Sequence, residues 1–261
     1  MSNQPTDKKN FDCAVPFNSH TSSFFDSVII DNFKKGNAKY LKKIWNELPA
    51  SFLMSHEALK SCYYEYLSNS KLYESFKFIC SQNIDLNQRT FMGSGFLEEA
   101  VVHDNIKAAK LLIESGADIN VLHEPYNDTP AFHIKSRNML TILREYNADF
   151  NIIDSEGDTI LHSLIQKNTH IEIIKDIIEK TSFNLLDHIN NNFHSILDSA
   201  IISGQFCEKQ LDTMVYLYQL DVPYDKSKLN SYSWASSIMF QKHILSNNSI
   251  KPDIKLNKNR I

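Results

Sequence analysis

The chain has 261 residues, of which 42% are hydrophobic and 22% are charged, and its formal net charge at pH 7 is −4. This composition is typical of a folded protein and excludes an extensively disordered chain. Lys and Arg are scattered rather than gathered into a basic stripe, so we expect no nucleic-acid partner.

The first segment, residues 1–23, is polar and contains Pro5 and Pro16. It has no hydrophobic run of the kind that a signal peptide carries, and its composition predicts a disordered leader. No segment of the chain approaches the roughly 18 consecutive apolar residues of a membrane-spanning helix.

From residue 24 to 225, helix-like apolar runs alternate with polar turns at intervals of about 33 residues. One ending recurs, as Asn-Ile-Asp-Leu-Asn at 83–87, Gly-Ala-Asp-Ile-Asn at 116–120 and Asn-Ala-Asp-Phe-Asn at 147–151. Gly and Asn tolerate the left-handed backbone that ends a helix, and Asp stabilises the turn that follows. The recurrence predicts a solenoid of stacked helix pairs.

A second marker opens each unit. Thr-Ile-Leu-His occupies 159–162, and Thr-Pro-Ala-Phe-His occupies 129–133 with one inserted residue. The equivalent positions fall near Ser27, Cys62, Gly95, Thr129, Thr159 and Ser195. This spacing indicates about six degenerate repeats with one shortened helix. Apolar residues at helical spacing in the fifth repeat are predicted to lie in the core between repeats, namely Leu161, Ile165, Ile174 and Ile178.

These endings and openings resemble those of the ankyrin-repeat family, most strongly over residues 95–186. The resemblance implies an all-α fold, an ankyrin-repeat solenoid of about six helix-turn-helix repeats with hairpin tips and a C-terminal helical cap. We place the repeats in 24–225, the cap in 226–246 and a polar, mildly basic tail in 247–261.

The resemblance also implies a non-enzymatic, monomeric module that binds a protein through its hairpin tips and the concave face of its first helices. Large or charged side chains at those positions in our register are the predicted partner-binding residues: Tyr66, Arg89, Phe91, Met92, Glu99, His103, His123, Tyr126, Lys135, Arg137 and Lys167.

Catalytic and metal-binding signatures are missing from the sequence, which has no nucleophile elbow, P-loop, kinase motif or zinc-ligand spacing. We therefore expect no cofactor, no metal site and no enzymatic activity. His133 and His162 stand at the Thr-Pro-Leu-His position and are assigned a structural role. The cysteines lack C-x-x-C spacing and are typical of structural thiols in a reducing compartment: Cys13, Cys62, Cys80 and Cys207.

The runs that end at Asn120 and Asn151 resemble the Leu-x5-Asp-apolar-Asn pattern that a eukaryotic asparaginyl hydroxylase modifies in ankyrin proteins. Both are candidate hydroxylation sites if the chain enters a eukaryotic cytosol. The alternative is that each Asn only stabilises its turn.

The Asn-, Lys- and Ile-rich composition, with degenerate repeats, resembles the ankyrin effectors of intracellular bacteria such as Legionella. That resemblance implies a virulence effector that a type IV secretion system delivers into the host cytoplasm. The alternatives are an adaptor or inhibitor inside its own cell, an enzyme whose site lies in the non-ankyrin ends, and an F-box-like ubiquitin-ligase adaptor. The F-box reading depends on Trp-Asn-Glu-Leu-Pro at 45–49, where Leu-Pro is also an ordinary helix stop.

Overall fold

A computed structural model of the chain describes residues 19–48, 53–82, 84–90, 93–180, 185–203, 210–227 and 235–246. Among these residues the structure is helical, and its extended pairing takes the form of isolated bridges such as those of His123 with Asp128 and Ile153 with Thr159. The predicted all-α class is confirmed. None of the described helices combines the length and hydropathy that crossing a bilayer requires. The chain divides into two compact units, residues 1–91 and 92–261.

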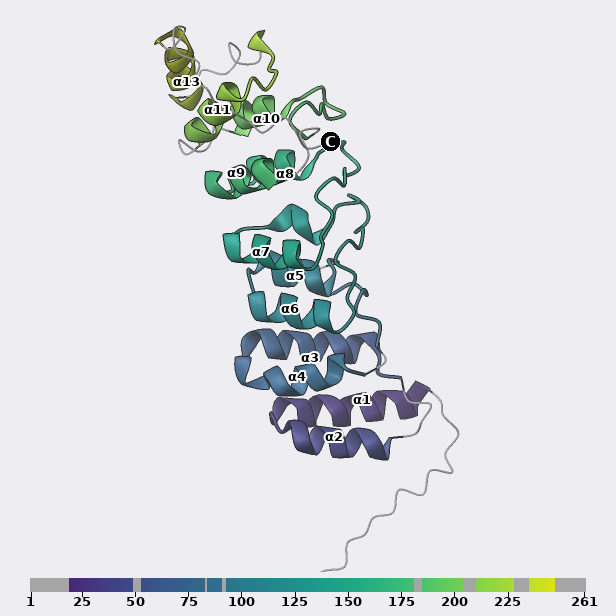
Figure 1. Cartoon of the computed structure of the whole chain (residues 1–261). Helices are drawn as coiled ribbons and strands as arrows, with labels where there is room; N and C mark the ends of the chain where they lie inside the picture. The colour runs from purple at the N-terminus through teal and green to yellow at the C-terminus, as the bar shows by residue number, and fades with distance from the viewer. Residues whose placement is uncertain are drawn as a thin grey trace, which may run out of the picture. The chain divides into compact units, whose positions relative to one another are not determined.

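The first unit contains two helix pairs (Figure 1). Its elements are α1 (Ser19–Lys34), α2 (Ala38–Glu47), α3 (His56–Ser68), η1 (Ser70–Leu72) and α4 (Tyr73–Cys80). α1 packs on α2 and α3, and α4 packs on α2 and α3. Aromatic rings fill the core between the pairs. Phe33 and Tyr63 are fully buried, and their ring centroids lie 6.4 and 5.7 Å from that of Phe76.

The helices of this unit begin earlier than the repeat spacing predicts. Ser55 is the N-cap of α3, and its hydroxyl accepts a hydrogen bond from the Ala58 N–H at 3.1 Å. The predicted opening at Cys62 instead lies buried in the middle of that helix. Ser27 likewise lies inside α1, which has 16 residues. The register was wrong here because the spacing was extended from later repeats into a segment without their signature residues.

The second unit also consists of helix pairs, and its first helices are shorter. Its elements are α5 (Phe96–Val102), α6 (Ile106–Glu114), η2 (Pro130–His133), α7 (Arg137–Glu145), α8 (Ile160–Gln166), α9 (Ile171–Lys180), α10 (Ile196–Ser203), α11 (Gln210–Gln219) and α13 (Ala235–Ser246). The first elements α5, η2, α8 and α10 pack in one row, and α6, α7 and α9 pack in a second (Figure 1). Gly95, Thr129 and Thr159 are N-caps of the first row, so the predicted register is confirmed in these repeats.

The first helix of the fourth repeat is reduced to one short 3₁₀ turn, η2, of four residues. The chain leaves it in an extended conformation at Ile134 and enters α7 at the N-cap Ser136. By contrast, α5 and α8 on either side have seven residues each. The missing turns leave room between the C-terminal ends of α5 and α8.

The third residue of three first helices makes the same kind of hydrogen bond to the N-cap backbone. The third helical residue is Glu98 in α5, His162 in α8 and Asp198 in α10, and each accepts a hydrogen bond from the N-cap backbone N–H, at 3.2, 3.3 and 3.1 Å. His162 also reaches the carbonyl of His194 at 3.1 Å, and Asp198 accepts from the N–H of Asp225 at 2.8 Å. The structural role predicted for His162 is confirmed.

The recurring Asp-x-Asn ending also has a structural basis. Asp85, Asp118 and Asp149 each accept a hydrogen bond at 2.9 Å from the backbone N–H two residues further on. These bonds fix the turn after the second helix. Asn120 links this turn to the next repeat, because its side-chain oxygen accepts a hydrogen bond from the Asp149 N–H at 2.8 Å.

The last described helix, α13, packs on α11. Phe240 of α13 is fully buried, and its ring lies 5.8 Å from that of Tyr218 and 6.4 Å from that of Tyr224. This packing fits the predicted C-terminal cap. The domain limits stay predictions, and the leader and the tail lie outside the described residues.

Candidate partner-binding surface

Large apolar side chains are exposed on three consecutive hairpin tips of the second unit. We call them the tip strip: Leu122, Tyr126, Ile153, Ile189 and Phe193, with exposed fractions of 53%, 59%, 46%, 45% and 82%. The first two belong to the tip of the fourth repeat, the third to that of the fifth and the last two to that of the sixth. Apolar side chains on a turn are not needed to bury the helices beneath, so their recurrence on consecutive tips makes this surface a candidate for partner binding.

Backbone hydrogen bonds join the three tips to one another. The Ser155 N–H donates to the carbonyl of Tyr126 at 2.7 Å, and the Asn191 N–H donates to the carbonyl of Glu156 at 3.1 Å. The amide side chain of Asn191 also donates to the carbonyl of Ser155 at 3.2 Å. The tip strip is therefore carried on a connected backbone rather than on three independent loops.

Phe193 is held outward by the turn that contains it. Its φ is 60°, a left-handed conformation that costs free energy in a residue with a bulky side chain. Asn190 sustains the turn, because its side-chain oxygen accepts from the Asn192 and His194 N–H groups at 3.0 and 2.9 Å. The Asn190 amide in turn donates to buried Asp158 at 2.6 Å. Phe193 is not among the partner-binding residues predicted from the sequence, although an aromatic residue in a polar turn was a visible signal.

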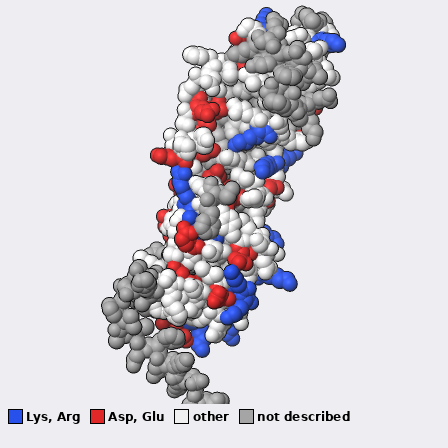
Figure 2. Space-filling model, turned by 180° about the vertical axis from the view of Figure 1, so that it is seen from behind, with Lys and Arg blue, Asp and Glu red and all other residues white. Residues whose placement is uncertain are grey.

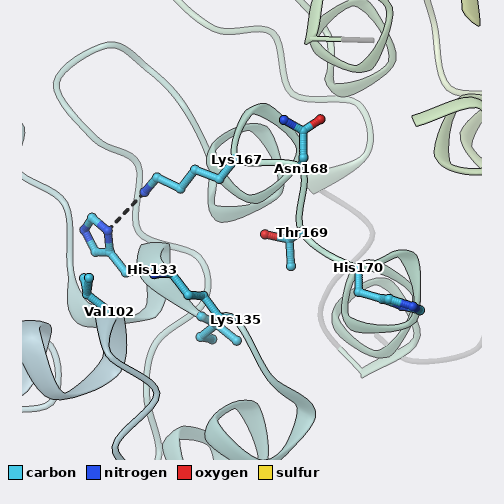
Figure 3. A pocket seen from close by; sticks show the side chains of 8 residues that line it. Val102, His133, Lys135, Lys167, Asn168, Thr169 and His170 are labelled. Carbon is cyan, nitrogen blue, oxygen red and sulfur yellow. Dashed lines mark hydrogen bonds between the residues drawn. The ribbon is translucent and has the colours of Figure 1, made fainter. Parts of the chain in front are cut away.

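A pocket of about 470 Å³ lies at the opposite end of the first helices (Figure 3). It is lined by Val102 at the end of α5, by His133 at the end of η2 and the two residues after it, and by residues 167–170 after α8. It occupies the space that the short η2 leaves open. None of its lining residues is acidic, whereas two are lysines and two are histidines.

Lys167 forms one wall of this pocket. Its ammonium donates to the carbonyl of Phe132 at 3.0 Å and contacts His133 Nδ1 at 3.1 Å, as Figure 3 shows for the second interaction. Although the side chain as a whole is exposed, partial desolvation of its ammonium lowers the pKa of Lys167, and the neighbouring charge of Lys135 lowers it further, against the opposing effect of nearby carboxylates. Because an ammonium can only donate, His133 Nδ1 accepts here and the ring proton is on Nε2.

That proton is directed at two carboxylates. His133 Nε2 lies 2.8 Å from Asp128 Oδ2 and 3.3 Å from Glu98 Oε1. The other oxygen of Glu98 lies 2.8 Å from Nδ1 of buried His123. Burial by itself would raise the pKa of Glu98, but the hydrogen bond from His123 and the electrostatic interactions with His133 and His123 hold that pKa below its usual value.

Glu98, Asp128 and His133 place one ligand atom each within 4.8 Å of one another, and such groups bind divalent cations in other proteins. The hydrogen bonds above account for the same distances. The Lys167 ammonium behind His133 also opposes a second positive charge at this place. We therefore interpret Glu98, Asp128 and His133 as a hydrogen-bonded cluster. The expectation of no metal site stays a prediction.

No protein-family model matches the chain. A putative ankyrin repeat protein of Acanthamoeba polyphaga mimivirus is 34% identical to it over 112 residues, which is 42% of this chain and 13% of that protein. The crystal structure of an ankyrin repeat domain from Acinetobacter baumannii matches the fold with a TM-score of 0.52 at 23% identity, over 71% of this chain and 94% of that one. The fold is an ankyrin-repeat solenoid. The chain spans only a small part of the length of the curated relative.

In the ankyrin framework, three of the predicted partner-binding side chains are buried. Tyr66 stacks on Phe76 at 4.8 Å within the first unit and is 3% exposed, because the early start of α3 turns it into the core. Glu99 is 4% exposed and accepts a hydrogen bond from Ser94, and His123 is 6% exposed beside Glu98. These three have too little free surface to act as anchors.

Arg137 also differs from its expected place on the concave ankyrin face. It is the first residue of α7, in the row of second helices, and its guanidinium forms an ion pair with Asp176 of α9 at 2.9 Å. Phe91 and Met92 lie outside the described residues. The remaining predicted contacts are exposed and stay candidates: Arg89, His103, Tyr126, Lys135 and Lys167.

Charges of both signs are interspersed on the ankyrin surface that Figure 2 presents, and the Lys and Arg side chains do not form one stripe there. The expectation of no nucleic-acid partner stays a prediction.

Proposed function

We propose that the chain is a non-enzymatic protein-binding module that holds a partner protein along the tip strip. The exposure of five large apolar side chains on three linked tips carries this proposal. Protein interfaces obtain most of their binding free energy from a few such anchors, with aromatic residues prominent among them. A surface that is already ordered also loses less conformational entropy when it binds.

The chemistry of the strip indicates the kind of partner surface. Tyr126 presents a ring and a hydroxyl, whereas Ile153 and Phe193 present apolar area alone. A partner segment that fits them offers apolar side chains at intervals that match the neighbouring tips. Effector, adaptor and inhibitor roles all use such a surface. Delivery into a host cell stays a prediction of the resemblance, because residues 247–261 lie outside the described residues.

The F-box alternative receives no support from the first helix pair. Trp45 packs its ring edge-on against Phe78 at 5.7 Å, and Leu48 is the C-cap of α2. The segment therefore ends a helix of the first unit, and this favours the binding-module proposal over an F-box.

Site-specific photo-cross-linking tests the proposal. A photoreactive phenylalanine analogue replaces Tyr126 in one variant, Phe193 in a second and Met239 of α13 in a third. Met239 is 48% exposed and apolar but is not part of the tip strip, so it is a matched control. The variants are irradiated in lysates of bacterial and eukaryotic cells, and the adducts are identified by mass spectrometry.

The proposal predicts that both tip positions capture one and the same protein and that the Met239 position does not capture it. Unlabelled wild-type chain should compete for this adduct, and a Leu122→Ala/Ile153→Ala variant should not. Adducts that form equally from all three positions, or from none, would overturn the proposal.

A further inference from the structure

The pocket beside η2 is lined by hydrogen-bond donors that the fold leaves unused. Two of the three N–H groups of Lys167 form hydrogen bonds to the Phe132 carbonyl and to His133, so one N–H remains for a ligand. Lys135 is exposed and makes no ion pair or hydrogen bond within the described residues. The side-chain oxygen of Asn168 already accepts from Gln210 at 2.9 Å, so its NH₂ group is what it can offer.

Thr169 completes this set. Its side-chain hydroxyl points toward the space between Lys167 and Lys135 (Figure 3). Thr169 also lies just before the N-terminus of α9, whose partial positive charge offsets the partial negative charge at the C-terminal ends of α5 and α8. The carboxylates that act most strongly on Lys167, Asp128 and Glu98, are not lining residues, and His133 and His123 already engage them.

We propose that this pocket receives the anionic side chain of a bound partner protein, either a carboxylate or a phosphorylated residue. The proposal rests on the proposed function and adds the chemistry of one partner residue. A volume of about 470 Å³ is large enough to admit a Glu, Asp or phosphorylated side chain. The two lysines repel each other across the open pocket, and an anion between them would relieve that repulsion.

The position of the pocket also predicts the spacing of the partner residues. α8 runs from its N-cap Thr159, beside the tips, to its C-cap Lys167, in the pocket. Its seven residues span about 10 Å. An extended chain covers this distance in about three residues. The partner residue that enters the pocket should therefore lie about three positions from one that contacts the tip strip.

A peptide series tests this inference. Each fluorescent peptide carries one Phe and, three positions away, Glu, Asp, phosphoserine, Gln or Ser, in an otherwise constant Gly/Ala background. Binding to the whole chain is measured by fluorescence anisotropy. Charge-assisted hydrogen bonds from the pocket should make the acidic and phosphorylated peptides bind about tenfold more tightly than the Gln and Ser peptides.

Three variants separate the pocket from general electrostatics. Lys135→Gln is decisive because that side chain is exposed and its loss leaves the fold intact, and it should remove most of the acid preference. Lys167→Gln should do the same, although it also removes a bond to Phe132. Lys107→Gln on α6 is the matched control, since Lys107 is exposed but not a lining residue, and it should change nothing.

Equal binding of the Glu and Gln peptides, or an acid preference that survives Lys135→Gln, would overturn the inference. So would binding of anionic vesicles or RNA that Lys135→Gln and Lys167→Gln abolish, because the ligand would then not be a protein side chain. The cross-linking result at the tips is independent of these outcomes, so the proposed function can stand while this inference fails.

Discussion

Arg137 and Asp176 form a bidentate ion pair that connects α7 to α9. Arg137 Nε and Nη2 donate to the two Asp176 oxygens at 2.9 and 3.0 Å, and Arg144 donates to the Asp176 carbonyl at 3.2 Å. This pair joins second helices of adjacent repeats. It therefore explains an arginine that the sequence pattern had placed on the binding face.

Replacing Arg137 with Ala should lower the free energy of unfolding and leave partner binding unchanged. The guanidinium is 59% exposed, so the loss should be about 0.5–1 kcal/mol. Arg137→Lys should recover only part of it, because an ammonium cannot form both hydrogen bonds. Urea unfolding measures the change, with Lys107→Ala as the exposed control. Loss of partner binding without loss of stability would return Arg137 to the interface.

Leu161→Ala tests the packing between repeats. Leu161 is fully buried in α8, as predicted, so the change should cost about 2–5 kcal/mol of unfolding free energy. Leu122→Ala removes the same atoms from a side chain that is 53% exposed and should cost less than about 0.5 kcal/mol. A cost for Leu161→Ala below about 1 kcal/mol would contradict the register of the fifth repeat.

Glu98 should make stability depend on pH in the acid range. Its folded pKa lies below the ordinary value of 4.5, so its contribution is complete above that pH and is lost as pH falls through the folded pKa. The destabilisation caused by Glu98→Gln should therefore be large at pH 7 and should shrink as the pH falls below about 4.5. Urea unfolding at a series of pH values checks this, with the exposed Glu179→Gln as control. A pH-independent difference would contradict the assignment.

Asn120 is the first candidate for hydroxylation in a eukaryotic cytosol. It precedes Asn151 as a candidate because its turn belongs to the most regular repeat. Its side-chain oxygen accepts a hydrogen bond from the Asp149 N–H at 2.8 Å, and the Asn151 side chain is exposed. We predict an added oxygen on the peptide that contains Asn120, detected by mass spectrometry after expression in eukaryotic cells. An Asn120→Ala chain is the control for the assignment. Unmodified Asn120 under normal oxygen would leave it a purely structural residue.

The helix starts and turns were predicted correctly from the sequence where a polar side chain has one characteristic hydrogen bond to the nearby backbone. Thr159 and His162 identify the start of a first helix, and Asp118 and Asp149 identify the turn after a second, because these side chains bond to nearby backbone. Tyr66 failed because the segment around it lacks such markers, and an error in the helix start changes which face a side chain occupies. The cap at Ser55 was not distinguishable from other serines.

The candidate surface was harder to predict because it depends on packing. The spacing indicated one shortened helix, but only the stacked neighbours α5 and α8 show that its loss opens a pocket at Lys167. Phe193 was missed since its exposure follows from the left-handed turn that Asn190 supports.

The most direct test of the central claim is the dissociation constant of the protein captured at the tips, measured for the wild type and for Tyr126→Ala/Phe193→Ala. Two lost anchors should weaken binding at least about a hundredfold. The melting temperature should stay within a few degrees, because both side chains are mostly exposed. Ile238→Ala/Met239→Ala on α13 is the matched control and should bind as the wild type does. Unchanged affinity of the tip variant would contradict the claim, and so would unfolding of that variant, which would make Tyr126 and Phe193 packing residues.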